Sequence, residues 1–575
     1  MQYKQSRWDL LALGIKNIEA SMKTIEERVA SFEKKKKLLK NTISQKTFLS
    51  LIAELEDIVR LTTKLGVYAN LRFSENSKDQ KAVAEMSSVE QFLTQIQNRL
   101  LYFSLWFKHL PQSKASELIN ASKKYKYYLE YMRKLKPHTL EEKEEKIINI
   151  KDNTGQSALL TLYELITSHF EFKFQGKNRT QEEMYQFIRN KSSKVREQAY
   201  KTLLAPYIKN KDILGEIYKN ILNDWRAENI ELRGHRSPIA VRNTINDIPD
   251  EAVEALLAVC SRNEHLFTRF FEIKRKRLKL KTLRRVDIYA PIRKEKADIP
   301  YDTAVQLVLS TFQGFNQEFY DAAKKIIDNN HVHSTVQQGK RPGAFCCSST
   351  TSILPYILLS YTKTWRDVST LAHELGHGIH AILASKQTEF TQEACLPLAE
   401  TASIFSEMLL SEKILKENPN AAKQLIFMKL DDIYASIIRQ AGFVRFEIQA
   451  HEMIKQGKTV DEMSQAYLAA LRQQLGKNVE VDDIFAYEWA YIPHIFHTPF
   501  YCYAYAFGNL LTLALYKKYK QEGEPFVKKI ITMLSMGSSA SPVEITKIVG
   551  VDITSQAFWQ QGFDAIEEMI RQLEE

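Results

Sequence analysis

The chain has 575 residues, which exceeds the length at which one hydrophobic core usually stops growing, so a large helical body or two to three subdomains are expected. Only 19 residues are Gly and 15 are Pro, and so few turn-forming residues predict long helices. The formal net charge of +11 arises from 80 basic and 69 acidic residues, which is modest for this length and indicates a solvated surface.

We expect neither a targeting segment nor a disulfide framework in this chain. The N-terminal stretch MQYKQSRWDLLALGIKNIEA lacks the apolar core of a signal peptide, and no run approaches the ~18 apolar residues of a membrane span. The five cysteines are scattered, and two of them, Cys346 and Cys347, are adjacent, which does not suit a structural disulfide. We therefore expect a cytoplasmic protein with reduced thiols and no membrane partner.

From Leu10 to about Leu165, apolar residues recur at three- and four-residue spacings, which predicts a stack of helices. A polar break, QGKNRTQEE at residues 175–183, separates this part from the rest of the chain. The prediction is an N-terminal helical domain over residues 1–180 and a second, mostly helical domain over residues 181–575.

Two basic runs, FEKKKKLLK at residues 32–40 and KRKRLKLKTLRR at residues 274–285, are candidates for phosphate contacts. Neither run interleaves aromatic side chains with its charges, and no nucleic-acid-binding motif accompanies them. We interpret both runs as solvated helical surface and expect no nucleic-acid partner.

The composition changes over residues 331–361, HVHSTVQQGKRPGAFCCSSTTSILPYILLSY. β-branched and aromatic residues, a Gly-Lys-Arg-Pro-Gly turn and two short apolar runs predict a small β-sheet in this segment. An exposed strand edge of such a sheet is suited to holding an extended peptide through main-chain hydrogen bonds.

The segment STLAHELGHGIHAI, residues 369–382, reads as a helix that carries histidines on one face. A Thr-x-x-Asp pattern just before it predicts a capping box. His373 and His377 are four residues apart, so both imidazoles can bind one ion, with Glu374 beside them to act on water. His-Glu-x-x-His is expected by chance only about 0.02 times in a chain of this composition, which favours a metal site over a histidine-containing helix contact.

A third ligand has to come from outside this helix. His380 lies about 10 Å along the helix axis from His373, too far to bind the same ion, so it is expected to support a ligand or to contact substrate. Glu400 is the preferred ligand because it falls in the first turn of a predicted helix that opens at Pro397, among small residues that permit close packing. Glu407 is the alternative ligand, or it orients a ligand histidine.

Two histidines and one carboxylate leave one coordination position open for water, as in catalytic zinc sites. Zinc lowers the pKa of its water to about 7, and Glu374 is placed to take the proton and to pass it to a leaving amine. The sequence therefore predicts one Zn²⁺ per chain and hydrolysis of an amide.

The segment YIPHIFHTPFYCYAYAFG, residues 491–508, concentrates further histidines and tyrosines. Pro499 predicts the start of a helix on which Tyr501 and Tyr505 share a face. These side chains either form an aromatic core or donate a hydrogen bond to an oxyanion, and spacing alone favours neither role.

The motifs TLAHELGHGIH, LAETASIFSE and IPHIFHTPFYCYAYAFG, with GKRPGAFC ahead of them, resemble in order and spacing the thimet oligopeptidase and oligoendopeptidase F family of zinc metallopeptidases, most closely the bacterial oligoendopeptidase F branch. The similarity extends over most of the chain. The resemblance implies a mainly α, two-lobed body with a deep channel, with zinc at the channel floor and short peptides as substrates. It makes residues 181–575 the catalytic domain.

The resemblance also implies roles for individual residues. It implies zinc ligation by His373, His377 and Glu400, with Glu374 as the catalytic base. The implied catalytic contacts are His494, Tyr501 and Tyr505, and the implied substrate contacts are Gly343, Ala344, Phe345, His380, His497 and Tyr503. Tyrosine spacing after the histidine differs between branches of the family, so the choice of the oxyanion donor stays open, with Tyr501 and Tyr505 preferred. Small insertions between branches make His497 an alternative to His494.

Two other functions remain open at this stage. A zinc carboxypeptidase of similar helical architecture also combines His-Glu-x-x-His with a later glutamate, and it differs in cutting only at a free chain end. A non-catalytic peptide-binding protein could keep the scaffold without turnover, although every predicted ligand and the predicted base are present.

Overall fold

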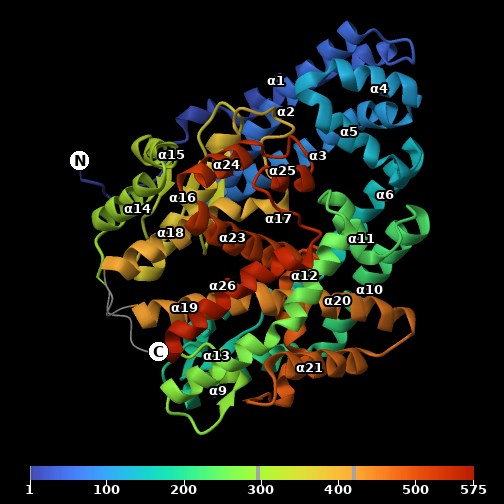
Figure 1. Ribbon diagram of the computed structural model, residues 1–575. Helices are drawn as coiled ribbons and strands as arrows, with labels where there is room; N and C mark the ends of the chain where they lie inside the picture. Colours follow the sequence, from blue (N-terminus) through green and yellow to red (C-terminus); the bar gives the residue numbers. More distant parts are fainter. Residues whose placement is uncertain (1, 293–297, 418–421) are drawn as a thin grey trace. The chain divides into compact units, whose positions relative to one another are not determined.

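Long segments with apolar residues at helical spacing fold as helices in the computed structural model, which describes residues 2–292, 298–417 and 422–575 (Figure 1). Helix accounts for 72% of the structure and strand for 3%. The predicted mainly α fold class with small sheets is confirmed.

The chain forms two compact units, and each is assembled from three separate segments. The first unit comprises Met1–Lys143, Glu295–Ile414 and Lys518–Val551, and the second comprises Glu144–Lys294, Leu415–Lys517 and Asp552–Glu575. The predicted division into an N-terminal helical domain over residues 1–180 and a catalytic domain over residues 181–575 stays a prediction.

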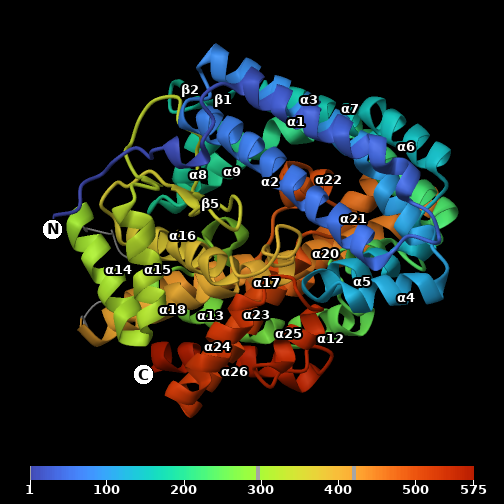
Figure 2. The same cartoon turned by 90° about the horizontal axis from the view of Figure 1, so that it is seen from above.

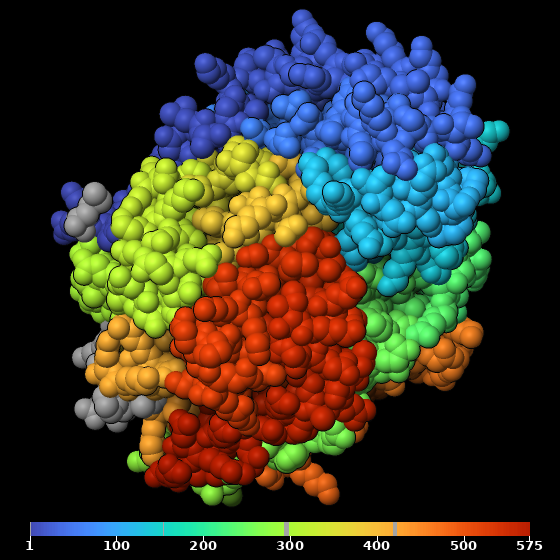
Figure 3. All heavy atoms as spheres, turned by 45° about the horizontal axis from the view of Figure 1, so that its top comes forward, coloured from blue at the N-terminus to red at the C-terminus, as the bar shows by residue number. Residues whose placement is uncertain are grey.

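The first unit contains a bundle of N-terminal helices and a second group of helices around a small sheet. Aromatic and aliphatic side chains of the N-terminal helices, including Phe32, Phe48 and Phe107, form a continuous core. The space-filling view shows these helices, in blue, as one continuous surface (Figure 3). The helices of the unit are α1 (Ile18–Glu33), α2 (Gln45–Glu75), α3 (Gln80–His109), α4 (Gln112–Ala121), α5 (Lys126–Lys134), α14 (Tyr301–Phe315), α15 (Gln317–Asp328), α16 (Trp365–Ala384), α17 (Leu396–Ala399), α24 (Glu524–Ser535) and α25 (Pro542–Lys547), and α18 (Thr401–Glu417) begins in it.

The predicted sheet over residues 331–361 is present, with three strands in the order β4-β6-β5. Strand β4 (Val332–His333) pairs parallel with β6 (Tyr356–Leu358), and β5 (Phe345–Cys347) pairs antiparallel with β6. Helix α16 contacts β5 and β6 and also packs against the α14–α15 hairpin (Figure 2). The histidine-bearing helix is therefore held between a sheet and a helical layer.

The second unit is also helical, with short strand pairs at its surface. Its helices are α7 (Gln156–Ser168), α8 (Gln181–Ile188), α9 (Ser193–Lys209), α10 (Lys211–Arg226), α11 (Pro238–Ile245), α12 (Asp250–Arg262), α13 (Glu264–Arg277), α19 (Ala422–Ile433), α20 (Arg439–Lys455), α21 (Val460–Leu475), α22 (Pro493–His497) and α26 (Gln556–Glu574), while α6 (Glu142–Thr154) and α23 (Tyr503–Glu522) lie mostly in it. Its strands are β1 (Phe172–Phe174), β2 (Lys177–Arg179), β3 (Leu283–Arg284) and β7 (Val479–Glu480).

The predicted solvated surface over residues 274–285 is wrong at two positions. Lys274 is fully buried, and its Nζ lies 2.6 Å from Asp431 Oδ1. Arg285 forms a buried ion pair with Glu488. Because buried charges need a paired partner, these two side chains are committed to their carboxylates and are not available to phosphates.

None of the helices in the described part of the chain combines the length and the apolarity that crossing a bilayer demands.

Candidate active site

Helix α16 begins where its sequence predicts. The Thr364 hydroxyl accepts a hydrogen bond from the Asp367 N–H at 3.2 Å, and the Asp367 carboxylate accepts one from the Thr364 N–H at 2.9 Å. This capping box satisfies two N–H groups that a helix start otherwise leaves open, and it fixes the helix register. His373 and His377 then lie one turn apart, with ring centroids 4.9 Å from each other.

A glycine lets the next helices approach α16 closely. A Cβ on Gly376 would lie 2.6 Å from Ser403 Cα and 2.7 Å from the Ala402 carbonyl oxygen, closer than backbone atoms tolerate. Pro397 opens α17 as predicted, but this helix ends at Ala399, and Glu400 lies between α17 and α18. The close approach brings the Glu400 carboxylate to the histidines.

The three predicted ligands come together. Oε2 of Glu400 lies 3.4 Å from His373 Nε2 and 3.3 Å from His377 Nε2. One donor atom from each of the three residues falls within 4.8 Å of the other two. The Ser403 hydroxyl donates a hydrogen bond to the same Glu400 oxygen at 2.9 Å and so orients the carboxylate.

The electrostatics of this cluster follow from its burial and its mixed charges. Burial works against the charged imidazolium of His373, but the hydrogen bond to Glu407 and the nearby carboxylates outweigh it and raise the pKa of His373 to about 9. Burial also works against the charged Glu400 carboxylate, and the His377 hydrogen bond outweighs it, so the pKa of Glu400 falls to about 2. The cluster thus combines a strongly ionised carboxylate with two imidazoles.

Glu407 and Glu374 flank the cluster with different contacts. Oε1 of Glu407 lies 2.6 Å from His373 Nδ1, which leaves Nε2 of that ring toward Glu400. Glu374 has an exposed fraction of 5%, and its buried Oε2 has no hydrogen-bond partner among the residues that the structure describes. Burial is the main reason that the pKa of Glu374 is raised.

His380 lies on the same helix and is buried. It shares a hydrogen bond with the backbone of Ala399, next to Glu400, and its burial lowers the pKa of the ring to about 4. The structure therefore places His380 against the segment that carries Glu400.

The predicted strand residues lie at one edge of the small sheet. Gly343 has a φ of +86°, a conformation that favours glycine, and Ala344 leads into β5. Phe345 packs beside Trp8, with ring centroids 6.3 Å apart. Strand β5 is one of the two outer strands of the sheet and contacts α16.

In the second unit, the structure brings together His494, Tyr501 and Tyr505. The ring of Tyr501 is nearly parallel to His494, with an interplanar angle of 6° and centroids 5.9 Å apart. Tyr505 lies edge-on to Tyr501 at 5.1 Å, and its hydroxyl is 3.4 Å from His494 Nε2. Tyr503 points elsewhere, because it is fully buried and its hydroxyl accepts a hydrogen bond from Asn246 at 2.7 Å.

The prediction that Pro499 opens a helix is wrong. Helix α23 begins at Tyr503, so Tyr501 lies in the turn before it. Phe500, with a φ of +60°, has a left-handed backbone conformation that a helix does not allow.

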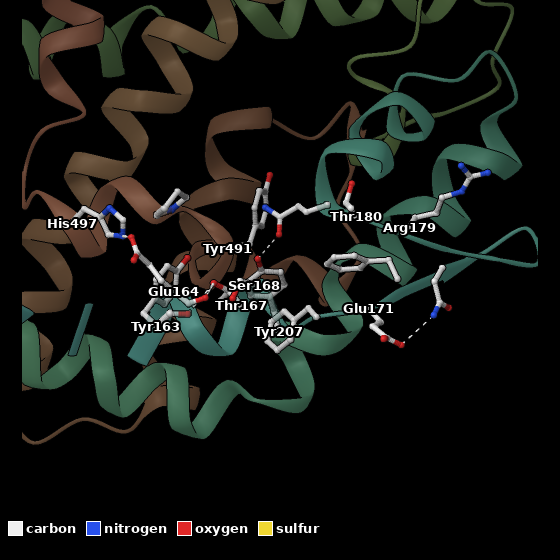
Figure 4. Close-up of a pocket in the computed structure, with 15 residues that line it drawn as sticks. Tyr163, Glu164, Thr167, Ser168, Glu171, Arg179, Thr180, Tyr207, Tyr491 and His497 are labelled. Carbon is white, nitrogen blue, oxygen red and sulfur yellow. Dashed lines mark hydrogen bonds and ion pairs between the residues drawn. The ribbon is translucent and has the colours of Figure 1, made fainter. Parts of the chain in front are cut away.

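His497 lies at a separate pocket that the sequence did not indicate. The pocket has a volume of about 560 Å³ and is lined by aromatic side chains, among them Tyr163, Tyr207 and Tyr491 (Figure 4). The Nε2 of His497 lies 3.4 Å from Glu164 Oε1. Residues 175–183, read from the sequence only as a polar break, include the β2 strand and part of the pocket wall.

Comparisons with known families cover most of the chain. The sequence model of peptidase family M3 matches residues 186–565, and the model described as oligopeptidase F matches residues 106–172. Among curated relatives, an oligoendopeptidase F homolog from Borreliella burgdorferi is 27% identical over 96% of this chain and 95% of its own length. Oligopeptidase PepF of Bacillus subtilis is 24% identical over 89% of this chain and 78% of its own length.

Solved structures agree with these matches. The crystal structure of a protein described as a peptidase, from Chlamydophila abortus, superposes with a TM-score of 0.84 at 25% identity, over 99% of this chain and 97% of the other. Oligoendopeptidase-F from Enterococcus faecium superposes with a TM-score of 0.74 at 20% identity, over 97% of this chain and 98% of the other, which shows a shared fold. The family match spans more than half of the sequence, and the chain therefore belongs to peptidase family M3.

Proposed function

We propose that this peptidase is a zinc-dependent endopeptidase, an oligopeptidase that hydrolyses internal bonds of short peptides. The observation that carries the proposal is the convergence of His373, His377 and Glu400, with donor atoms within 4.8 Å of one another. Two imidazole nitrogens and one carboxylate oxygen form a donor set of catalytic zinc. The names of the curated relatives, oligoendopeptidase F and oligopeptidase, support the endo mode and the short substrates.

A zinc ion held by these three residues would supply Lewis acidity for hydrolysis near neutral pH. Glu374 would take a proton from the attacking water and deliver it to the leaving amine nitrogen. Its buried Oε2, which has no hydrogen-bond partner in the described part of the chain, and its raised pKa suit a group that must both accept and release a proton.

Glu407 would act on the histidine and not on the substrate. Its carboxylate bonds Nδ1 of His373 at 2.6 Å, which fixes the ring orientation and directs Nε2 toward the ion. Carboxylates that orient ligand histidines in this way tune metal affinity. The alternative role of Glu407 as third ligand is less well supported, because Glu407 is engaged with Nδ1 of His373, whereas Oε2 of Glu400 lies within 3.4 Å of Nε2 of both histidines.

The remaining roles are extended from the family resemblance. His494, Tyr501 and Tyr505 would donate hydrogen bonds to the oxyanion of the transition state, where one donor is typically worth ~10²–10³ in rate. Strand β5 with Gly343 and Ala344 would hold the extended peptide by main-chain hydrogen bonds.

His380 and His497 are carried as substrate contacts in the same proposal, whereas Tyr503 is not, because its ring is fully buried and its hydroxyl accepts a hydrogen bond from Asn246. The pocket beside His497 gives that residue room for a substrate side chain. We extend the proposal to a cytoplasmic location, a substrate channel and one zinc per chain, with residues 181–575 as the catalytic domain.

Cleavage of an internally quenched peptide of about ten residues, blocked at both termini, tests the proposal. We expect internal cleavage, mapped by mass spectrometry of the products, and its loss in 1,10-phenanthroline. A carboxypeptidase would leave the blocked peptide intact and shorten an unblocked one from its C-terminus. Peptide binding without cleavage of any member of a diverse pool would instead indicate a binding protein.

A further inference from the structure

The turn that connects α22 to α23 contains a strained residue. Phe500 has a φ of +60° in a position where glycine is favoured. A bulky residue in this region is strained and persists only when surrounding contacts hold it. Those contacts identify what fixes the turn.

Two buried polar side chains hold the backbone of this turn. Oε1 of Glu447, on α20, accepts a hydrogen bond from the Phe500 N–H at 2.7 Å, and Glu447 is completely buried. Nε of Arg242, on α11, donates to the Pro499 carbonyl at 3.1 Å. The ring of His451, one turn after Glu447, stacks on the Phe500 ring at 5.3 Å with an interplanar angle of 15°.

The residue presented by this turn is Tyr501. Its ring is packed parallel to His494 and edge-on to Tyr505. Since Phe500 directly precedes Tyr501, a change in the backbone at Phe500 would rotate the tyrosine away from His494.

We propose that Glu447 is a positioning residue, which holds the left-handed turn at Phe500 through one hydrogen bond and thereby sets the place of Tyr501 beside His494. The inference rests on the proposed function, in which Tyr501 and His494 contact the transition state. Glu447 itself lies beneath the turn and touches no substrate.

The surroundings of Glu447 define which substitutions are informative. Burial raises the pKa of Glu447 to about 8, with Arg242 and the Phe500 N–H acting in the opposite direction. Its Oε2 is buried and has no hydrogen-bond partner among the described residues. An uncharged acceptor of the same shape is therefore sufficient, and Glu447→Gln keeps that acceptor while Glu447→Met removes it.

The experiment compares kcat and KM of the full-length zinc-loaded protein on the blocked quenched peptide. We expect Glu447→Met to lower kcat by about 10-fold to 100-fold with little change in KM, because a displacement of about 1 Å costs up to that factor. Glu447→Gln should retain kcat within about threefold. Glu452→Met, on the exposed face of the same helix, is the matched control and should keep wild-type kcat and KM.

Amide hydrogen exchange of the metal-free protein gives a second readout that does not depend on activity. The Phe500 N–H should exchange at least about 10-fold faster in Glu447→Met and at the wild-type rate in Glu447→Gln, because only the former loses its acceptor. If Glu447→Met does not fold, Arg242→Met tests the same turn from its other hydrogen bond and should also lower kcat with KM retained.

The inference is overturned if the Met variant keeps wild-type kcat, or if kcat falls without faster exchange at Phe500. It is also overturned if Glu447→Gln is as impaired as Glu447→Met. A wild-type protein that cleaves no peptide contradicts the proposed function, and it then also contradicts the positioning role, which rests on that function. An active wild type with an unimpaired Met variant contradicts the positioning role alone.

Discussion

Glu374 and Glu407 are two carboxylates beside His373, and their different contacts indicate different roles. Glu407 is committed to Nδ1 of His373 at 2.6 Å. Glu374 is buried, and one of its oxygens bonds to nothing in the described structure. A carboxylate left in this state costs free energy in the fold, and such costs are typical of residues retained for chemistry.

Glu374→Gln tests the base directly. The substitution preserves the shape of the side chain but removes its ability to take a proton, so we expect a loss of about 10²–10⁴ in the single-turnover rate with zinc still bound. Zinc content is measured by atomic absorption on the same sample, with Glu318→Gln on the exposed start of α15 as the control. Retained cleavage in a zinc-loaded Glu374→Gln protein would eliminate this residue as the base.

Glu407→Gln tests the support of the metal ligand. Loss of the charged partner of His373 should weaken zinc affinity by about 10-fold to 100-fold, measured by competition with a chelating dye. Glu412→Gln, one and a half turns along α18, is the matched control because its carboxylate pairs with Lys520 and not with a histidine. Equal zinc affinities of the two variants would show that Glu407 does not tune the site.

Among the elements, the contact of α16 with α18 decides whether the site assembles. Gly376→Ala should destabilise the protein by about 1–3 kcal/mol and weaken zinc binding, since the new Cβ meets backbone at Ser403 and Ala402. Gly378→Ala is the matched control, because its Cβ would crowd a side chain and no backbone: the terminal Cδ1 of Ile326 lies at 2.5 Å, and Pro355 Cγ and Ile357 Cδ1 lie at the ordinary contact distances of 3.5 and 3.7 Å. An unhindered Gly→Ala change in a helix gains up to about 1 kcal/mol, so a Gly376→Ala protein more stable than Gly378→Ala would contradict the close approach.

Helix α20 should make stability depend on pH through Glu447. Because the pKa of this carboxyl is raised to about 8 in the fold, from an ordinary value near 4.5, the folded protein keeps a proton that the unfolded chain releases. The contribution of this proton to the free energy of unfolding is complete below about pH 4.5 and is lost as the pH rises through 8. The free energy of unfolding falls in this range by at most about 1.4 kcal/mol per pH unit.

Urea unfolding of metal-free wild type and Glu447→Gln at pH 5.5, 7 and 8.5 measures this dependence. The glutamine side chain of the variant cannot ionise. The urea midpoint of the variant should therefore rise relative to that of the wild type as the pH increases. The groups that face Glu447, namely Arg242, Tyr218, Cys502 and His451, remain the same in both proteins. A constant difference between the two midpoints from pH 5.5 to 8.5 would show that Glu447 is already ionised.

The elements that sequence predicted best are those governed by local chemistry. The capping box at Thr364, the small sheet and the histidine face of α16 all follow from neighbouring residues. The turn before Tyr501 could not be predicted, because a buried glutamate 53 residues earlier in the chain imposes the conformation of Phe500. The burial of Lys274 was missed for the same reason, since its partner Asp431 is 157 residues away.

For the whole molecule, the family and the convergence of His373, His377 and Glu400 were predictable, and the assembly of the chain was not. The spacing of motifs predicted the peptidase family, which the match over residues 186–565 confirms. The two compact units interleave segments far apart in sequence, a consequence of tertiary packing that local patterns do not encode. The pocket beside His497 arises in the same way from separate segments of the second unit.

The central claim is that zinc at His373, His377 and Glu400 is required for peptide hydrolysis. Titration of metal-stripped wild type with zinc, while hydrolysis of the blocked peptide is recorded, tests it most directly, with His377→Ala treated in parallel. We predict that activity rises with added zinc and saturates at about one ion per chain, as for a single catalytic site, while His377→Ala gains none. Full activity of the stripped wild type, or equal restoration of His377→Ala, would contradict the account.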